Sequence, residues 1–467
     1  MDLDPSPLFR DLETGERPVV AVSGGSDSLA LLLLAHDYLS RHRPSARLLA
    51  VTVDHGLRPE SAAEAARVAS LCRALGIAHE TVAWRGEKPR TGLAAAAREA
   101  RYRLLADAAA RAGATLVLTG HTLDDQAETL AMRAMRGEGA GREGPGMAGM
   151  ARATLFDNRV WIARPLLSLR RQALRAWLRG RGVEWIDDPS NENPAYERAR
   201  VRRQLSARES AVLAARAQER GIARLALARQ AAALVARHAT RAAPGLLRLE
   251  RALFGAATQD REAATLALRV ALAAAGGASR LPDLARVEAL HDRLAQGAPL
   301  RATPLRVTPL RATLSRAVVD ARKNGVFIRR EARDLPAVPL DGATILWDGR
   351  WRVTAAAEPA GLSVGPLGRA AAKALAAKSE APHAPAPPAL VLAALAAQPA
   401  LFTGGSLVGP PGGSDAVAHG VSAIPVVAPF ARFMPAFEEP LAAVFAALVG
   451  APPPPAGPWR GHIAVRA

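Results

Sequence analysis

A serine- and glycine-rich hexapeptide at residues 23–28 has the composition of a phosphate-binding loop. Its adjacent glycines can adopt positive φ and leave room for a ligand against the backbone. The serines add hydroxyl donors, and the aspartate could hold a Mg²⁺ ion that accompanies phosphates. An ordinary strand-to-helix turn with a good cap fits this local chemistry equally well. The six residues are Ser23, Gly24, Gly25, Ser26, Asp27 and Ser28.

A second group of polar residues combines a histidine with carboxylates at helical spacing. His121 and Asp125 are four residues apart and Glu128 follows three residues later, so all three share a face if the first turn is helical. Such a group could hold Mg²⁺ or position a nucleophile. The alternative is an N-capped helix whose acidic first turn complements its dipole.

Short apolar runs predict the strands that must position these groups. The valine-rich run 18–22 precedes the glycine loop, and a leucine-rich helix starts at residue 29. Strands alternating with helices predict an α/β fold with a doubly wound, mostly parallel sheet that binds ligands at the carboxyl ends of its strands. Further strands are predicted at 48–53, 78–83, 115–119 and 160–167, and helices at 61–75, 91–111, 124–136 and from Ser168.

Three groups of polar residues fall at such strand ends. They are the hexapeptide, the pair Asp54 and His55, and the pair Gly120 and His121. Because the carboxyl ends of parallel strands share one edge, we expect all three groups at one site. The GxGxxG sequence at 139–144 follows a helix instead of a strand, so we interpret it as a loop near that edge.

The composition favours a polyanionic partner. The formal net charge is +18, which indicates nucleic acid first and an anionic membrane second, although the abundance of arginine also fits a genomic bias. The single cysteine, Cys72, excludes an intramolecular disulfide and a cysteine-based cluster within the chain. No apolar run approaches the roughly 20 residues of a membrane span. We therefore expect a cytoplasmic protein.

Taken together and in order, the motifs resemble those of the tRNA(Ile)-lysidine synthetase family, which belongs to the PP-loop ATP pyrophosphatases. The matching stretches are SGGSDS at 23–28, VDHGLR at 53–58, AAREARY at 96–102, TGHTLDDQAETLAMRAMRGEG at 119–139, RPLLSLRRQAL at 164–174 and DPSNENPAYERARVR at 188–202.

The resemblance implies an adenine-nucleotide α-hydrolase-like fold and a two-step ligase reaction. ATP, with Mg²⁺, would adenylate the 2-carbonyl oxygen of the wobble cytidine in a CAU-anticodon tRNA(Ile) and release pyrophosphate. The ε-amine of free L-lysine would then displace AMP and give lysidine. Two rival hypotheses are a PP-loop enzyme that uses another amine or RNA, and a non-catalytic tRNA-binding protein. The oligomeric state stays open, with a homodimer as one candidate.

The resemblance also assigns roles to residues. Arg98 would touch the ATP phosphates or the adenylate, Asp125 would orient or deprotonate the lysine amine, and Asp27 completes the catalytic set. The ATP site would comprise Ser23, Gly24, Gly25, Ser26, Asp27, Ser28, Asp54, His55, Gly120 and His121. Mg²⁺ would bind Asp27, Asp125 and Glu128. Contacts to tRNA are expected from Arg133, Arg136, Arg164, Arg198 and Arg202.

We expect three regions along the chain. Residues 1–205 would form the PP-loop catalytic domain. Residues 206–335, rich in alanine and arginine, would form a mainly helical tRNA-binding domain. Residues 336–467 are rich in proline and alanine and would form a small, reduced and divergent C-terminal region.

Overall fold

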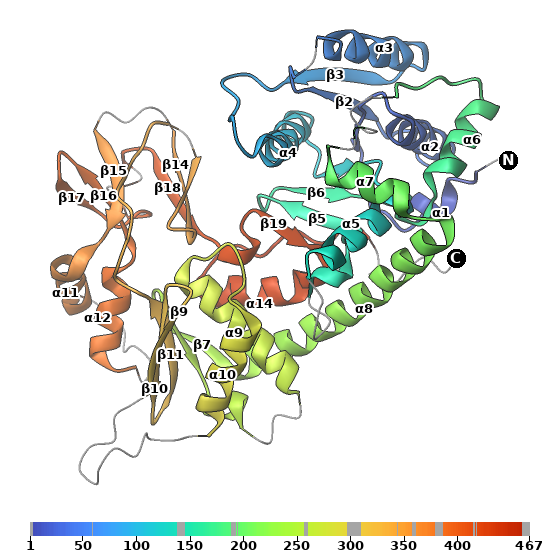
Figure 1. Cartoon of the computed structure of the whole chain (residues 1–467). Coiled ribbons are helices and arrows are strands. Elements are labelled where there is room, and N and C mark those ends of the chain that lie inside the picture. The colour runs from blue at the N-terminus through green and yellow to red at the C-terminus, as the bar shows by residue number, and fades with distance from the viewer. Residues whose placement is uncertain are drawn as a thin grey trace. The chain divides into compact units, whose positions relative to one another are not determined.

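The chain folds into two compact units in the computed structural model (Figure 1). Unit 1 comprises Met1–Leu225, Pro435–Phe437 and Pro455–Ala467, and unit 2 comprises Ala226–Met434 and Glu438–Pro454. The structure describes residues 3–57, 59–137, 145–187, 193, 195–255, 260–296, 310–342, 344–356, 361–378, 386–413, 416 and 418–459.

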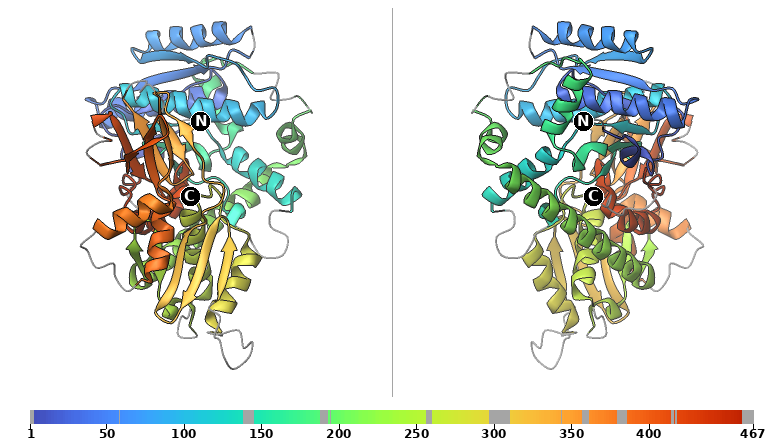
Figure 2. Two further views of the ribbon diagram at one scale, coloured as in Figure 1. Left: turned by 90° about the vertical axis from the view of Figure 1, so that its left-hand side faces the viewer. Right: turned by 90° about the vertical axis from the view of Figure 1, so that its right-hand side faces the viewer.

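Unit 1 is built on a mostly parallel sheet, coloured mainly blue to green in Figures 1 and 2. The strand order is β19-β5-β6-β4-β1-β2-β3. Neighbours from β3 to β6 pair in parallel, and β5 is antiparallel to β6. The doubly wound prediction is confirmed. The strands are β1 Val19–Ala21, β2 Leu49–Asp54, β3 Ala78–Ala83, β4 Leu116–Leu118, β5 Ala153–Phe156, β6 Val160–Ala163 and β19 Phe433–Pro435.

The position of β1 in this sheet explains why a ligand site forms after it. β1 lies between β2 and β4, so the chain runs outward in opposite directions from this point. Ligands of open α/β sheets bind at such a switch point, outside the carboxyl ends of the strands. The glycine loop at 23–25 follows β1 at this place.

Helices pack on the sheet of unit 1 through their apolar side chains. In α4, Tyr102 and Leu105 are buried in one cluster with Val19, Val51 and Val117 from three strands. The helices are α1 Ser6–Phe9, α2 Ser26–His42, α3 Ser61–Ala74, α4 Leu93–Arg111, α5 Leu123–Met135, α6 Arg171–Gly180, α7 Glu197–Gln204 and α8 Ala207–His238, which continues into unit 2.

Two predicted helix starts differ from the structure. Ser61 and Glu64 have the spacing of a capping box, which predicts Ser61 as the N-cap of α3. The N-cap is instead Glu60, and no side chain caps the helix, so this prediction is wrong. Ser168 ends a 3₁₀ turn, Pro165–Ser168, and α6 begins only at Arg171. The later start has a functional consequence, because it places Arg171 in the first turn of α6.

Unit 2 contains a second sheet where the sequence predicted mainly helices. Its strand order is β7-β8-β11-β10-β9, and α9 is buried against it along its whole length. Helices do form here, but the prediction of a mainly helical domain at 206–335 does not include this sheet. The elements are β7 Ala239–Ala243, β8 Leu246–Leu249, α9 Arg261–Gly276, α10 Leu284–Ala295, β9 Arg311–Leu314, β10 Ala317–Arg322 and β11 Gly325–Arg330.

The proline- and alanine-rich C-terminal region is folded in its described parts. It forms a four-stranded sheet, β12-β15-β16-β17, and a three-stranded sheet, β13-β14-β18. The elements are β12 Val338–Pro339, β13 Thr344–Trp347, β14 Trp351–Ala355, β15 Leu362–Pro366, α11 Gly368–Lys378, α12 Pro388–Ala396, β16 Pro399–Thr403, β17 Ser406–Gly409, β18 Val421–Pro425 and α14 Glu439–Val449.

The last described residues return to unit 1. Trp161 Nε1 donates to the carbonyl oxygen of Pro455 at 3.3 Å, and Leu12 forms a β-bridge with Trp459. The guanidinium of Arg152 lies 4.3 Å from the centre of the Trp459 ring. Among the described helices of both units, none combines the length and apolarity that a bilayer span requires.

Candidate functional site

The glycine loop after β1 is braced by its own serine and by a distant segment. Ser23 N–H donates to Ser28 Oγ at 3.1 Å, and Ser28 Oγ donates to the Gly25 carbonyl at 2.9 Å. Gly24 has φ +84°, and a Cβ there would lie 2.7 Å from Ile186 Cδ1. Gly24 is therefore required both by its backbone conformation and by the close approach of Ile186.

The loops after β1 and β4 touch, as the shared strand edge predicts. A Cβ on Gly120 would lie 2.9 Å from the carbonyl carbon and oxygen of Asp27. Glycine at position 120 thus permits backbone contact, which brings the start of α2 beside the loop that leads to α5. The group around His121 and the hexapeptide belong to one site.

Asp125 caps helix α5 with one of its carboxylate oxygens. Asp125 Oδ2 accepts from Thr122 N–H at 2.7 Å and from Thr122 Oγ1 at 2.8 Å. Both halves of a capping box are present. The N-capped helix, which the sequence offered as the alternative to a functional group, is therefore present. The cap uses only Oδ2, so the second oxygen of Asp125, Oδ1, can contact other partners.

Three arginines bind three carboxylates at this edge of the sheet, and we call the six residues the arginine–carboxylate network. Arg171 Nε lies 2.7 Å from Asp27 Oδ2, and Arg171 Nη2 lies 3.1 Å from Asp125 Oδ1. Arg198 contacts Asp125 Oδ1 at 2.8 Å and Glu128 Oε2 at 2.6 Å. Arg202 Nε reaches Glu128 Oε1 at 2.6 Å. Three positive charges thus face three negative charges.

This network does not form a metal site by itself. Within the described ranges, no group of three or more His, Cys, Asp or Glu side chains could hold a metal ion. The predicted Mg²⁺ ligands Asp27, Asp125 and Glu128 are instead each paired with a guanidinium. The residues therefore do not fit a resident Mg²⁺ bound by all three carboxylates.

Burial and charge shift the pKa values of the network in opposite directions. Burial raises the pKa of Asp27, although Arg171 opposes the shift. Burial also acts to raise the pKa of Asp125, but Arg171, Arg198 and His121 outweigh it and lower that pKa to about 2. The same carboxylates raise the pKa of Arg171 above its usual value, against the effect of burial. Asp125 is thus ionised at neutral pH.

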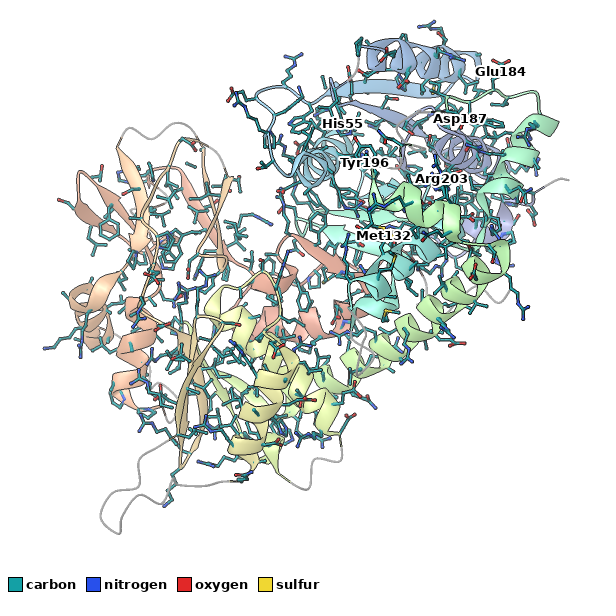
Figure 3. All side chains as sticks on the ribbon, viewed as in Figure 1. His55, Met132, Glu184, Asp187, Tyr196 and Arg203 are labelled. Carbon is teal, nitrogen blue, oxygen red and sulfur yellow. The ribbon has the colours of Figure 1, made fainter. Side chains whose placement is uncertain are left out.

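The two histidines at the strand ends are held neutral. Burial, with Arg164 nearby, lowers the pKa of His121 to about 3, and His121 Nδ1 lies 3.0 Å from Thr119 Oγ1. Burial, assisted by Arg101, lowers the pKa of His55 to about 4 (Figure 3). The Nδ1 atom of His55 is buried without a hydrogen-bond partner. A polar atom of this kind is a candidate for a ligand contact.

Asp54, predicted with His55 in the ATP site, holds a turn. Its Oδ1 accepts from Gly56 N–H at 2.8 Å, and this bond and one from Ser61 lower the pKa of Asp54. The turn fixes the backbone next to His55. Asp54 is therefore placed to support the site.

The arginines predicted to contact tRNA occupy different environments. Arg164 is 4% exposed and donates to the Ala151 carbonyl at 2.8 Å, so its prediction as a tRNA contact is wrong. Arg136 pairs with Glu197, and Arg133 donates to the Gly149 carbonyl at 3.3 Å. Arg198 and Arg202 belong to the arginine–carboxylate network. Arg98, predicted to be catalytic, is exposed and lies over the Tyr102 ring at 5.0 Å.

Sequence reasoning missed the arginines at the start of α6. Arg171 joins Asp27 to Asp125, and Arg170 Nε binds Asp124 Oδ1 at 2.9 Å. Both lie in the stretch 164–174 that carries the resemblance, but its sequence alone does not indicate which side chains reach the glycine loop. The GxGxxG sequence at 139–144 lies outside the described residues.

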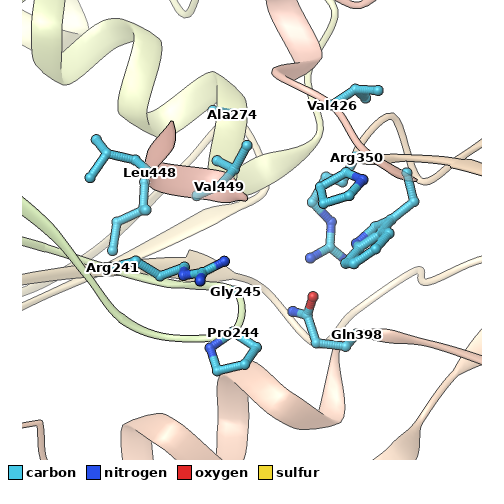
Figure 4. A pocket seen from close by; sticks show the side chains of 13 residues that line it. Arg241, Pro244, Gly245, Ala274, Arg350, Gln398, Val426, Leu448 and Val449 are labelled. Carbon is cyan, nitrogen blue, oxygen red and sulfur yellow. The ribbon is translucent and has the colours of Figure 1, made fainter. Parts of the chain in front are cut away.

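A separate cavity lies within unit 2, lined by residues from β7, β8, α9, β14, β18 and the end of α14, and by Gln398 just before β16 (Figure 4). Leu247, Leu448 and Val449 contribute apolar walls, and Arg241, Arg350 and Gln398 contribute polar groups. Arg350 is already bound to Asp348 at 2.7 Å. The lining contains no carboxylate, histidine or nucleophile, so the candidate site for chemistry is the one in unit 1.

Comparison with known proteins agrees with this geometry. Residues 6–209 match the family described as the PP-loop domain, so unit 1 carries an ATP-binding domain of that class. The chain is 47% identical over 461 residues to the tRNA(Ile)-lysidine synthase of Mesorhizobium japonicum, covering 98% of this chain and 97% of that protein. It is 40% identical over 359 residues to the same enzyme of Rhizobium meliloti, covering 74% and 75%. The chain belongs to the tRNA(Ile)-lysidine synthase family. The prediction of an enzyme of this family is confirmed.

Proposed function

We propose that the protein ligates free L-lysine to C2 of the wobble cytidine in the CAU-anticodon tRNA(Ile), with ATP as the energy source. The observation that carries this proposal is the likeness over 98% of the chain to a tRNA(Ile)-lysidine synthase, together with an intact glycine loop beside Asp125. A degenerate, non-catalytic member of the fold would have no need to retain that site.

In the first step, the 2-carbonyl oxygen of the cytidine attacks the α-phosphorus of ATP. The bond to the β-phosphate oxygen breaks, pyrophosphate leaves, and the tRNA becomes adenylated. The backbone N–H groups at Gly24–Ser26 and the start of α2 are suited to hold the leaving group. His55 and His121, both held neutral, are proposed to line the nucleotide, with Arg98 at the phosphates or the adenylate.

In the second step, the ε-ammonium of lysine first releases a proton to water, and the neutral amine attacks C2. The bond from C2 to the adenylate oxygen breaks and AMP leaves, and the excess proton on the newly bonded nitrogen passes to water. The amine is mostly protonated in neutral water, because its ordinary pKa is about 10.4. A carboxylate with a pKa of about 2 is a weak base, so we assign Asp125 to orienting the cationic amine, with Glu128 beside it. The positive amine would take the place of some of the positive charge that Arg171 and Arg198 now present to Asp125 and Glu128.

Mg²⁺ would accompany ATP into this site. Because the three carboxylates do not form a resident metal site, the ion would be held chiefly by the phosphates, with Asp27 as the carboxylate within the glycine loop. When bound, the ion offsets phosphate charge. No step assigned to the residues above depends on a protein-built metal site.

The tRNA would lie against the basic helices of unit 1. We propose phosphate contacts from Arg133, Arg136, Arg198 and Arg202, and from Arg216 on α8, which is exposed. Two arginines of α7 are partly exposed beside their carboxylates, with 40% of the Arg198 side chain and 33% of the Arg202 side chain accessible.

Pyrophosphate release tests the proposal. We expect the full-length protein to release pyrophosphate from ATP when CAU-anticodon tRNA(Ile) is present, and to incorporate lysine into that tRNA. ATP turnover with a different amine or RNA would retain PP-loop chemistry and reject the lysidine assignment. Tight tRNA binding without any ATP binding would favour a non-catalytic protein.

A further inference from the structure

Helix α6 presents two arginines, one turn apart, to the glycine loop. Arg171 Nε donates to Asp27 Oδ2 at 2.7 Å, and Arg175 Nε donates to Ser26 Oγ at 3.2 Å. The loop itself contains no lysine or arginine between residues 23 and 28. Departing pyrophosphate carries several negative charges, which fixed cationic groups stabilise. Helix α6 supplies such charge directly at the loop.

The two arginines differ in how firmly the protein holds them. Arg171 faces three carboxylates, and only 18% of its side chain is exposed. Arg175 is 34% exposed, and its acidic partner Asp187, at 2.5 Å, is 67% exposed. Exposed ion pairs contribute little, and guanidinium–phosphate pairs are strong and often bidentate. Arg175 can therefore exchange its partner at small cost.

Asp187 is held next to the loop by the segment that carries it (Figure 3). The preceding residue, Ile186, donates its N–H to the Gly24 carbonyl at 2.9 Å. Trp185 Nε1 donates to Asp187 Oδ2 at 3.1 Å, which orients the carboxylate. The Asp187 carboxylate is thus held beside the loop, where it pairs with the Arg175 guanidinium that also donates to Ser26 Oγ.

We propose that Arg175 binds the pyrophosphate part of ATP, and that Asp187 is the counter-anion that occupies its guanidinium until the nucleotide arrives. The inference rests on the proposed function, because it assumes that ATP is cleaved between its α and β phosphates. On binding, Arg175 exchanges the carboxylate of Asp187 for phosphate oxygens. Arg175 is then a substrate-binding residue, and Asp187 is a positioning residue that acts through it.

The chain offers a matched control on the same helix. Arg175 and Arg179 each lie 5.3 Å from the centre of the Trp185 ring, and Arg179 is exposed. Replacing either by alanine removes the same stacking contact, whereas only Arg175→Ala also removes the hydrogen bond to Ser26 and the ion pair with Asp187. A difference between the two variants therefore reports on the loop.

The experiment measures inhibition of the full-length enzyme by inorganic pyrophosphate, and the KM for ATP, in the presence of lysine and tRNA. Arg175→Ala should raise the pyrophosphate inhibition constant and the KM roughly 10- to 100-fold, as loss of a charged hydrogen bond does. Arg179→Ala should stay within about twofold. Asp187→Asn should lower the inhibition constant about two- to fivefold, because it removes the competing anion.

The opposite directions of the Arg175 and Asp187 variants exclude a purely structural ion pair, which would weaken pyrophosphate binding in both. Equal inhibition of the Arg175→Ala and Arg179→Ala enzymes overturns the inference, as does weaker inhibition of Asp187→Asn. If Arg175→Ala does not fold, the Asp187→Asn result decides alone. A wild-type protein that releases no pyrophosphate in the presence of tRNA would overturn the proposed function instead.

Discussion

Arginines surround aspartates in both units of this protein, yet the two clusters differ in burial and in their partners. In unit 2, Asp348 is fully buried and binds Arg330 at 2.9 Å and Arg350 at 2.7 Å, which are 1% and 7% exposed. In the arginine–carboxylate network of unit 1, exposure of the arginine side chains ranges from 18% to 40%. A third partner of Asp348, Arg316, is 46% exposed. In unit 2 the carboxylate and two of its three arginines are thus sealed, whereas all three arginines of the unit 1 network are partly open.

The partners of the two clusters differ as much as their burial. In unit 2, Arg330 also donates to the Glu331 carbonyl at 2.7 Å, and Arg350 donates to the Ala397 carbonyl at 2.5 Å. These bonds tie hairpin, helix and strand ends together. In unit 1, the guanidinium groups mainly meet carboxylates, at the switch point of a parallel sheet. The closed cluster suits a role in holding the fold, and the accessible one suits the role in substrate binding proposed above.

The largest expected effect is on stability, from Asp348→Ala. The variant leaves two buried guanidinium groups without their carboxylate, which costs about 3–5 kcal/mol. Urea denaturation followed by tryptophan fluorescence measures it, because Trp347 and Trp351 flank the site. Arg316→Ala is the control: this partner is 46% exposed and should cost no more than about 1 kcal/mol. Equal losses in the two variants would contradict a sealed cluster.

The next effect is on activity, from Asp125→Asn. The amide keeps an oxygen for the N-cap of α5 but loses the charge that would orient the lysine amine. Lysine incorporation should fall about 10²- to 10⁴-fold while the thermal midpoint shifts by only a few degrees. Asp124→Asn, one residue earlier, is the matched control and should lose less than about tenfold. Comparable losses from both would place Asp125 outside the reaction.

Acid should destabilise unit 1 through its buried histidines. His121 and His55 have pKa values of about 3 and about 4 in the folded state, below their ordinary value of 6.5, because burial disfavours the charged ring. The unfolded chain therefore binds more protons between these values and pH 6.5, so stability is lost as the pH falls through this window. Asp125, with a lowered pKa of about 2, adds to the loss below pH 4.

Denaturation of wild type and His121→Gln at pH 7 and pH 5 tests this expectation. The wild type should lose stability on going to pH 5, and the variant should lose less, because the ring whose pKa is lowered to about 3 is absent. An identical pH dependence would show that His121 is not held neutral by the fold.

The smallest expected effect concerns tRNA binding. It compares Arg202, whose charge is offset by Glu128, with the exposed Arg216. Arg216→Ala should reduce the slope of log affinity against log salt by about 1, as loss of one phosphate contact does. Arg202→Ala should reduce it by clearly less, because Glu128 already offsets that charge at 2.6 Å. Filter binding at several salt concentrations measures both slopes. Equal slopes would mean that the network opens fully when tRNA binds.

Local patterns predicted the framework of unit 1 well. The valine run before Gly24, the alternation of strands and helices, and the polar groups at strand ends all depend on neighbours in sequence. The network could not be predicted in this way, since Arg171 and Asp27 are 144 residues apart. Arg164 failed as a tRNA contact for the same reason, because its burial follows from tertiary packing.

The sequence does contain one local signal for the sheet of unit 2. Asn324-Gly325 is a strong hairpin signal, and it lies where the turn after β10 leads into β11, whose first residue is Gly325. The surrounding alanine and arginine residues favour helices on propensity alone, which explains why 206–335 was predicted as mainly helical. Tertiary pairing with β8 then completes the sheet.

Incorporation of labelled lysine into tRNA tests the central claim, that the open network of unit 1 is the reaction centre, most directly. The full-length protein, ATP and CAU-anticodon tRNA(Ile) are incubated with lysine, and the wobble nucleoside is identified by its mass. We expect one lysine on the cytidine with wild type and none with Asp125→Asn. Unmodified cytidine with wild type, or equal modification by the variant, would contradict the account.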